Sequence, residues 1–298
     1  MGCLGYRKPY RKEVQKMSKR SVTPVLPVAA LLCFSVTSSA ATQAQQAGAA
    51  QKQNAAPTAL WNSPSIAPKQ PQPSFGPRPR HDISGTWDAF AAGIQPTGVK
   101  SHAPFTEWGE KMANTYKPGD GPRKVALGLI NDPLDDCDPA GFPRNLFFEL
   151  RPFKVAQTSD QVLMLYEYQK VWRAIWTDGR ELPKDPESRW YGYSVGHWQD
   201  DYTFVVDTVG LDERTWLDNA GDPHSADMRV EETYRRVDQD TLELTVKVDD
   251  PKAYKEPWFG LNKFILHRQP SSFDIREMIC APSEAEEYRK EVAEPATK

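Results

Sequence analysis

Cysteine and histidine are scarce in this sequence, which has 4 Cys and 5 His among 298 residues. No two histidines stand at the spacing of a metal site, so a zinc centre is not expected. A Gly-rich turn between a strand and a helix is also missing, which argues against an enzyme that uses a nicotinamide or a nucleotide. We therefore expect neither a metal nor a cofactor.

A long apolar run is missing as well. The run at residues 25–36 is shorter than the roughly 20 residues that a helix needs to cross a bilayer, so no transmembrane segment is expected. A basic head precedes this run, and the small residues Ser38 and Ala40 follow it. This order is typical of a secretory signal peptide. We predict that residues 1–40 are removed and that the protein is exported, either to the periplasm or as a secreted protein.

Positive charge is in short supply once residues 1–40 are removed. The whole chain has 37 Lys and Arg against 40 Asp and Glu, and residues 1–40 hold seven of the basic and one of the acidic residues. The remaining 30 basic and 39 acidic residues give a net charge near −9. A basic stripe is absent, so no nucleic-acid partner is expected. The sequence leaves open the oligomeric state and whether translation starts at Met1 or Met17.

Composition divides the predicted mature chain into three parts. Residues 41–80 are rich in Ala, Gln and Pro, which predicts a disordered linker. Residues 81–282 are long enough to form one domain with a sizeable core, and residues 283–298 form an exposed tail. Within the domain, Cys137 and Cys280 are predicted to form a disulfide, the usual state of two cysteines in an oxidising compartment.

The hydrophobic pattern predicts a mainly β domain. One helix is expected at residues 104–116, with Thr106 as its N-cap, after a first strand at residues 83–90. From residue 152 on, apolar and polar residues alternate, and short polar turns separate the runs. The further strands expected are 152–158, 162–168, 171–178, 190–198, 202–208, 228–237, 241–249, 258–268 and 273–280. Such a series predicts an antiparallel up-and-down barrel or a strongly curved sheet.

Two resemblances accompany this pattern. Gly85-Thr86-Trp87 resembles the G-x-W signature of lipocalins, whose barrels hold small apolar ligands. The resemblance implies that Trp87 packs against an arginine from the end of the domain, Arg276 or else Arg268. Segments such as DPLDDCDPAGFPR, WTDGRELPKDP and TWLDNAGDPHS are similar to a family of uncharacterised exported bacterial proteins. That second resemblance supports the domain boundaries and implies no activity.

Residues 215–232 concentrate chemically useful side chains in one turn. His224 could act as a general base, oriented by Asp227 or by Asp218. The alternative is ordinary turn chemistry, because Asp222-Pro223 is a common turn and a histidine there often caps it.

Aromatic and charged residues predict a ligand cavity elsewhere in the domain. Aromatic rings with polar edges suit an apolar or sugar-like ligand, although they also fill the interior of a large barrel. The pattern does not decide whether Arg229 and Glu231 face the interior, and it allows a buried pair between Arg173 and Glu167. The expected ligand-binding residues are Trp172, Arg173, Trp176, Tyr191, Tyr193, His197, Trp216, Arg229, Glu231 and Trp258.

Three functions fit these observations. The first is binding of a small apolar or amphipathic molecule in an aromatic-lined cavity of a lipocalin-like barrel. The second is a secreted hydrolase, lyase or isomerase that uses His224 with a neighbouring carboxylate. The third is an envelope interaction protein without a small ligand.

Overall fold

The structure is a computed structural model that describes residues 77–89, 101–148 and 150–297. The chain divides into two units, Met1–Gln53 and Asn54–Lys298, and only the second contains described residues. The predicted signal peptide and nearly all of the predicted linker therefore lie outside the described residues. In the described part of the chain, no helix has the length and apolar character needed to cross a membrane.

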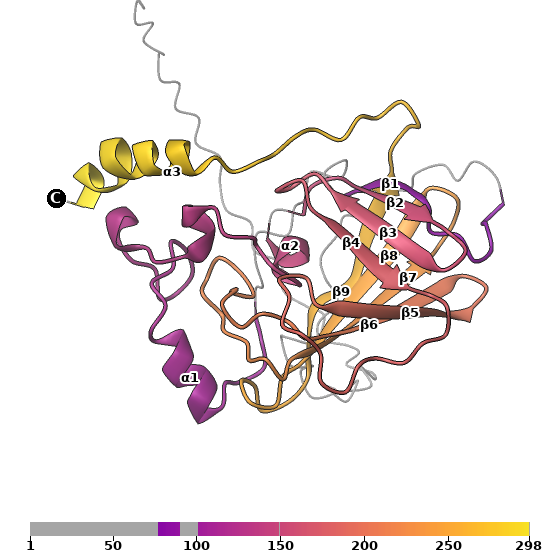
Figure 1. The fold of residues 1–298 in the computed structure, drawn as a ribbon, viewed down its shortest axis with the longest axis horizontal. Helices are drawn as coiled ribbons and strands as arrows, with labels where there is room; N and C mark the ends of the chain where they lie inside the picture. The colour runs from indigo at the N-terminus through magenta and orange to yellow at the C-terminus, as the bar shows by residue number, and fades with distance from the viewer. Residues whose placement is uncertain (1–76, 90–100, 149, 298) are drawn as a thin grey trace, which may run out of the picture. The chain divides into compact units, whose positions relative to one another are not determined.

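Strands in the described residues form one closed barrel in sequence order (Figure 1). The last strand pairs with the first, and this pairing closes the barrel. The mainly β fold and the barrel are thereby confirmed. The strands are β1 (Gly85–Asp88), β2 (Phe153–Gln157), β3 (Gln161–Tyr166), β4 (Trp172–Trp176), β5 (Tyr193–Asp200), β6 (Thr203–Val209), β7 (Arg229–Arg236), β8 (Thr241–Asp249) and β9 (Trp258–Arg268).

The pairing of β4 with β5 departs from the predicted antiparallel order. These two strands run parallel and share only two register pairs, Ile175 with Ser194 and Trp176 with Val195. All the other pairs in the barrel are antiparallel. Residues 177–192 connect the two strands, and a connection of this length carries the chain back so that β5 starts at the same end as β4.

Alternation along each strand separates the core from the outer surface. On β8, Leu242, Leu244, Val246 and Val248 are fully buried, and the residues between them are partly exposed. This period of two is expected where one face of a sheet packs inward and the other meets water. The inward residues of the other strands join the same hydrophobic core.

The predicted helix after the first strand is present but shorter than expected. It is α1 (Glu107–Ala113), and the Thr106 hydroxyl accepts a hydrogen bond from the Gly109 amide at 3.1 Å, as an N-cap does. Two more α-helices are α2 (Arg144–Phe147) and α3 (Pro282–Tyr288). Single-turn helices lie at Leu127–Leu129, Pro133–Asp136, Arg289–Ala293 and Pro295–Thr297.

The segment after β9 corrects one prediction. Residues 273–280 are not a strand, and within them only Met278 forms a bridge, to Tyr168. The pairing of β9 with β1 already closes the barrel, so no edge remains in it for a tenth strand. The segment is instead anchored by the predicted disulfide, which is confirmed between Cys137 and Cys280.

Trp87 on β1 packs against an arginine that the resemblance to lipocalins did not single out. Its ring lies 4.7 Å from the guanidinium of Arg236 on β7. Arg268 is the register partner of Trp87 on β9. The indole nitrogen donates to the carbonyl of Ile83 at 2.9 Å. The polar group of this buried tryptophan is therefore satisfied.

Candidate functional site

The barrel interior contains a buried ion pair. Arg173 on β4 and Glu232 on β7 point inward from their strands and are 3 % and 0 % exposed. The Arg173 Nη1 atom donates to Glu232 Oε1 at 3.1 Å, and Nη2 donates to Oε2. Two parallel hydrogen bonds of this kind form the strong, bidentate geometry of arginine with a carboxylate. The partner of Arg173 is therefore Glu232 and not Glu167.

Hydroxyl groups complete this pair. Arg173 donates to Ser194 Oγ at 3.0 Å and to Thr208 Oγ1 at 3.1 Å, and these two residues face each other on β5 and β6. The Tyr234 hydroxyl donates to Glu232 Oε1 at 2.5 Å. We call these five residues the Arg173 cluster. A buried ion pair is tolerated only when its remaining donors and acceptors are satisfied, and this cluster meets that condition.

The surroundings of Arg173 favour its charged form. Burial is the largest influence and opposes the charge of Arg173, but Glu232, Tyr166 and Tyr234 together outweigh it, so the pKa of the guanidinium is raised. Burial raises the pKa of Tyr166, which lies beside Arg173, to about 12. Phe142 adds an aromatic face 3.9 Å from the guanidinium. Tyr166 is therefore a neutral hydroxyl at physiological pH, next to a permanent cation.

A pocket of about 310 Å³ opens onto this cluster between β4 and β5. It lies where the two strands diverge from their short parallel pairing, beside residues 172–174 and 189–193. Arg173 and Ser194 belong both to the pocket lining and to the Arg173 cluster. The other lining residues are Gln161, Trp172, Ala174, Trp176, Arg189, Tyr191, Gly192 and Tyr193. We call it the β4–β5 pocket.

Aromatic rings and arginines surround the entrance of the pocket. The Arg180 guanidinium stacks 3.5 Å from the Trp176 ring and donates to the Tyr193 hydroxyl at 3.1 Å. Arg180 also holds Asp178 through several hydrogen bonds, the shortest at 2.6 Å. Trp172 is 67 % exposed. The entrance thus offers flat apolar surfaces with polar edges.

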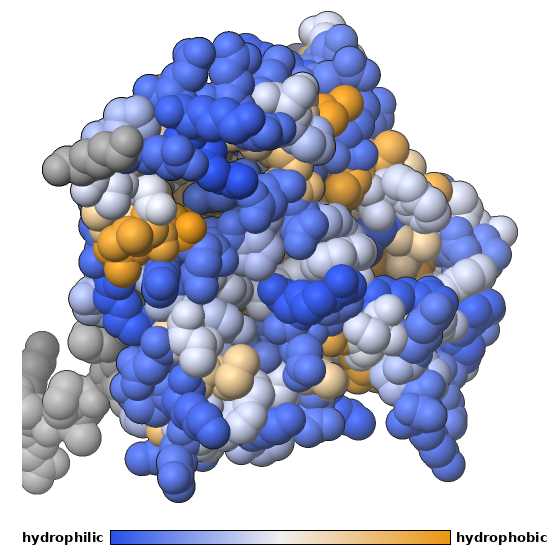
Figure 2. All heavy atoms as spheres, turned by 60° about the vertical axis from the view of Figure 1, so that its left-hand side comes forward, coloured by the Kyte–Doolittle hydropathy of each residue, from blue (hydrophilic) through white to orange (hydrophobic). Residues whose placement is uncertain are grey.

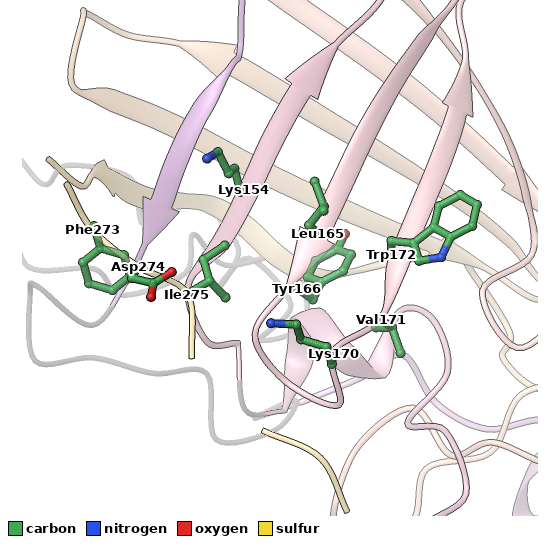
Figure 3. Close-up of a pocket in the computed structure, with 9 residues that line it drawn as sticks. All are labelled: Lys154, Leu165, Tyr166, Lys170, Val171, Trp172, Phe273, Asp274 and Ile275. Atoms are coloured by element: carbon green, nitrogen blue, oxygen red, sulfur yellow. The ribbon is translucent and has the colours of Figure 1, made fainter. Parts of the chain in front are cut away.

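A second pocket, of about 380 Å³, lies on the outer face of β2, β3 and β4. Lys154, Leu165 and Trp172 are register partners across the three strands. Figure 3 shows their side chains in one row, with residues 273–275 along one side and Lys170 at the adjoining turn. Trp172 lines both this outer pocket and the β4–β5 pocket, so the two adjoin.

His224 lies in a hydrogen-bonded loop. It is 1 % exposed, its Nε2 lies 2.8 Å from Thr215 Oγ1, and its Nδ1 lies 3.1 Å from the carbonyl oxygen of Ser225. A carbonyl only accepts, so Nδ1 carries a proton. Burial lowers the pKa of His224, so the ring is neutral. Its two nitrogens face a hydroxyl and a carbonyl, whereas the Asp227 side chain is exposed.

The same loop is fixed to the rest of the barrel through Asp250. The Ser225 amide and hydroxyl donate to the Asp250 carboxylate at 2.6 and 2.8 Å. The loop tryptophan, Trp216, stacks on Tyr116 with ring centroids 4.8 Å apart. Buried hydrogen bonds and ring packing therefore fix the shape of this turn.

Asp218 and Asp222 form a buried pair of carboxylates in this loop. Arg123 donates to Asp222 Oδ1 at 2.9 Å, and His102 Nε2 lies 3.6 Å from Asp222 Oδ2. Burial, with the Asp222 carboxylate as the second cause, raises the pKa of Asp218 to about 7, and burial raises that of Asp222 to about 6. The sequence placed Asp222 only in a turn and did not single out Arg123, because their proximity depends on a contact between distant loops.

The structure brings together half of the residues predicted to bind a ligand. Five of them, Trp172, Arg173, Trp176, Tyr191 and Tyr193, line the β4–β5 pocket. His197, Arg229 and Glu231 are exposed on the outer faces of β5 and β7, and Trp216 and Trp258 are buried. Sequence reasoning missed Thr208 and Glu232. The signal for Glu232 was its place between Val230 and Tyr234 in the inward series of β7.

Comparisons with protein-family models, with curated proteins and with solved structures give no match. The closed barrel is compatible with a lipocalin-like architecture. Among the described residues, no group of three or more His, Cys, Asp or Glu side chains is placed to hold a metal ion. The geometry of the pockets and clusters is therefore the basis for a function.

Proposed function

We propose that the protein binds a small amphipathic molecule in the β4–β5 pocket. The observation that carries this proposal is the lining of the pocket: aromatic side chains surround an opening whose base holds Arg173 and Ser194. The polar end of the ligand would face these two residues. Its apolar body would lie against Trp172, Trp176 and Tyr193.

The size and chemistry of the pocket support this assignment. Its volume of about 310 Å³ is at the lower end of the range of roughly 300–1,000 Å³ that is usual for small-molecule sites. Such sites combine apolar walls with a few fixed polar groups. The Arg173 cluster supplies polar groups that are already held in place by Glu232 and Thr208, which lowers the ordering cost of binding.

Acid–base catalysis by His224 receives less support from the geometry. A general base needs access to the proton that it removes, and His224 is 1 % exposed. A carboxylate would have to orient the ring, yet its Nδ1 faces the Ser225 carbonyl. Binding in the β4–β5 pocket therefore remains the better-supported function.

Blocking the pocket tests the proposal. Ala174 lines the pocket and is partly exposed, so Ala174→Trp fills the space. Ala156→Trp is the matched control, because Ala156 is a partly exposed strand residue on β2 outside both pockets. The ligands are a panel of small aromatic and alicyclic alcohols, ketones and carboxylic acids, measured by isothermal titration calorimetry.

The expected result is binding of at least one compound, weakened about tenfold or more by Ala174→Trp and unchanged by Ala156→Trp. A tenfold change corresponds to about 1.4 kcal/mol of binding free energy. Failure of every compound to bind the unmodified protein would overturn the proposal. Equal binding to both variants would do the same.

We also propose that the protein is exported. The Cys137–Cys280 disulfide supports this, because disulfides persist mainly in oxidising compartments. Residues 1–40 fused to a reporter enzyme that is active only after export provide the test. Reporter activity is expected, and its absence, with the fusion protein retained in the cytoplasm, would contradict export.

A further inference from the structure

We propose that the group recognised at the base of the β4–β5 pocket is uncharged, a hydroxyl or a carbonyl rather than a carboxylate or a phosphate. This inference rests on the proposed function, that the β4–β5 pocket is the ligand site. It narrows the ligand class to neutral amphipathic molecules, such as alcohols, phenols and ketones with a cyclic apolar body.

The first argument is that the charge of Arg173 is already neutralised. Its guanidinium makes a bidentate contact with Glu232 inside the barrel. Ser194 and Thr208 accept its remaining Nε and Nη2 hydrogen bonds. An anionic ligand would have to displace Glu232 or lie near its charge, and an uncompensated charge in this environment is costly.

Two arginines near the pocket are also paired with carboxylates, at the surface rather than in the interior. Arg180 is paired with Asp178 at 2.6 Å, and Arg189 is paired with Glu187 at 3.0 Å. Each of these carboxylates comes from the same loop as its arginine, so the pairing does not depend on a ligand. The pocket therefore presents cations that have their own counterions.

The second argument is the presence of buried polar groups that lack good partners. The Tyr191 hydroxyl lies beside the backbone of Gly141 and is buried, yet it has no hydrogen-bond partner of good geometry among the described residues. Tyr191 lines the pocket. Buried polar groups are nearly always satisfied by a partner. A hydroxyl or a carbonyl on a ligand can supply that partner.

Asn145 is a second buried polar residue of this kind, beside Tyr166. It is 2 % exposed, and neither atom of its amide has a well-formed hydrogen bond among the described residues. Its side chain adjoins the Tyr166 hydroxyl, which in turn adjoins Arg173. A tyrosine hydroxyl and an amide each both donate and accept. That combination matches a neutral polar group, whereas an anion would require donors alone.

Three probes with the same ring system separate the alternatives. Naphthalene has no polar group, 2-naphthol is neutral at pH 7, and 2-naphthoate is an anion. Isothermal titration calorimetry of the protein at pH 7 is expected to give 2-naphthol an affinity about tenfold higher than that of 2-naphthoate. Tyr191→Phe is expected to weaken 2-naphthol about fivefold to tenfold, the effect of losing one hydrogen bond, and to leave naphthalene unchanged.

Two control variants locate the binding. Tyr288→Phe changes an exposed tyrosine of the tail and is expected to change nothing. Lys154→Gln removes a cation of the outer pocket. Binding of 2-naphthoate that Lys154→Gln abolishes, and that Ala174→Trp leaves intact, belongs to the outer pocket and supports the exclusion of anions from the β4–β5 pocket.

The outcomes distinguish this inference from the proposed function. If 2-naphthoate binds as tightly as 2-naphthol and Ala174→Trp blocks both, the pocket is the ligand site but the inference of an uncharged group is wrong. If Tyr191→Phe weakens naphthalene as much as 2-naphthol, the role of the Tyr191 hydroxyl is also wrong. If none of the three probes and none of the panel binds, the proposed function itself fails.

Discussion

Arg173 and Glu232 lie on β4 and β7, strands that are not neighbours in the barrel, and their side chains meet in its interior. Strands β5 and β6 lie between them and contribute Ser194 and Thr208 to the same cluster. The pair therefore connects two sides of the barrel wall through side chains rather than through strand pairing. Residues of three consecutive strands, β5, β6 and β7, hold the guanidinium of Arg173 in place.

Removing one member of this pair is predicted to destabilise the protein strongly. Glu232→Leu leaves Arg173 as a buried, uncompensated cation, at a cost of about 3–5 kcal/mol. The double variant Arg173→Met with Glu232→Leu removes both charges and is expected to cost less than the single change. Urea unfolding followed by circular dichroism measures both, and a single variant within 1 kcal/mol of the unmodified protein would contradict the role of the pair.

The Asp218–Asp222 pair predicts a pH dependence of stability. Burial raises the pKa of both carboxyls above the ordinary aspartate value near 3.8, to about 7 and about 6. Between about pH 4 and pH 7 this pair therefore holds more protons in the folded protein than in the unfolded chain. The contribution of the pair to the free energy of unfolding then falls as the pH rises, by about 1.4 kcal/mol per pH unit for each proton of difference.

Asp218→Asn tests the origin of this slope. An asparagine keeps an oxygen that can accept from the Ala220 and Asp222 amides, as Asp218 does now, but it has no charge to bury. The variant is expected to lose stability less steeply between pH 4 and pH 7. Identical slopes for the variant and the unmodified protein, measured by urea unfolding across this range, would show that the pair is not the source.

His224 is predicted to matter for stability and not for binding. Its replacement by alanine removes a buried ring that contacts Thr215 and Ser225, so we expect a loss of about 1–3 kcal/mol. The dissociation constant of any ligand of the β4–β5 pocket should stay unchanged, as calorimetry can measure at a temperature where the variant is folded. A folded variant that loses binding would instead favour a functional role for His224.

The disulfide is predicted to contribute much of the stability. Cys137 and Cys280 are 143 positions apart, and in the chain-entropy model a loop of this length is worth about 4–5 kcal/mol, which native-state strain can reduce. The double variant Cys137→Ala with Cys280→Ala is expected to lose about 2–5 kcal/mol in urea unfolding. Reduction of the unmodified protein should produce a similar loss, and no loss in either case would contradict the prediction.

Much of the fold could be predicted because a barrel has one buried and one solvent-facing side. The alternation of Leu242, Leu244, Val246 and Val248 with polar neighbours marks β8 directly. The parallel direction of β5 relative to β4 could not be predicted in this way, because strand direction depends on the path of residues 177–192 and not on periodicity.

The candidate site was predictable only in part, for a related reason. Aromatic residues near Arg173 indicated a ligand site. Four of these aromatic residues line one pocket together with Arg173. The partner of Arg173 was not predictable, since Glu232 reaches it only after the barrel closes. His224 and the carboxylates of residues 215–232 suggested a catalytic site. In the structure, this turn is held largely by buried loop contacts.

The most direct test of the central claim is the site of ligand binding in solution. Titration of ¹⁵N-labelled protein with 2-naphthol, followed by amide chemical shifts, locates the site without any mutation. The β4–β5 pocket predicts that the largest shift changes fall at residues 172–176 and 189–194. Largest changes in the turn at residues 215–232, or no changes at saturating 2-naphthol, would contradict it.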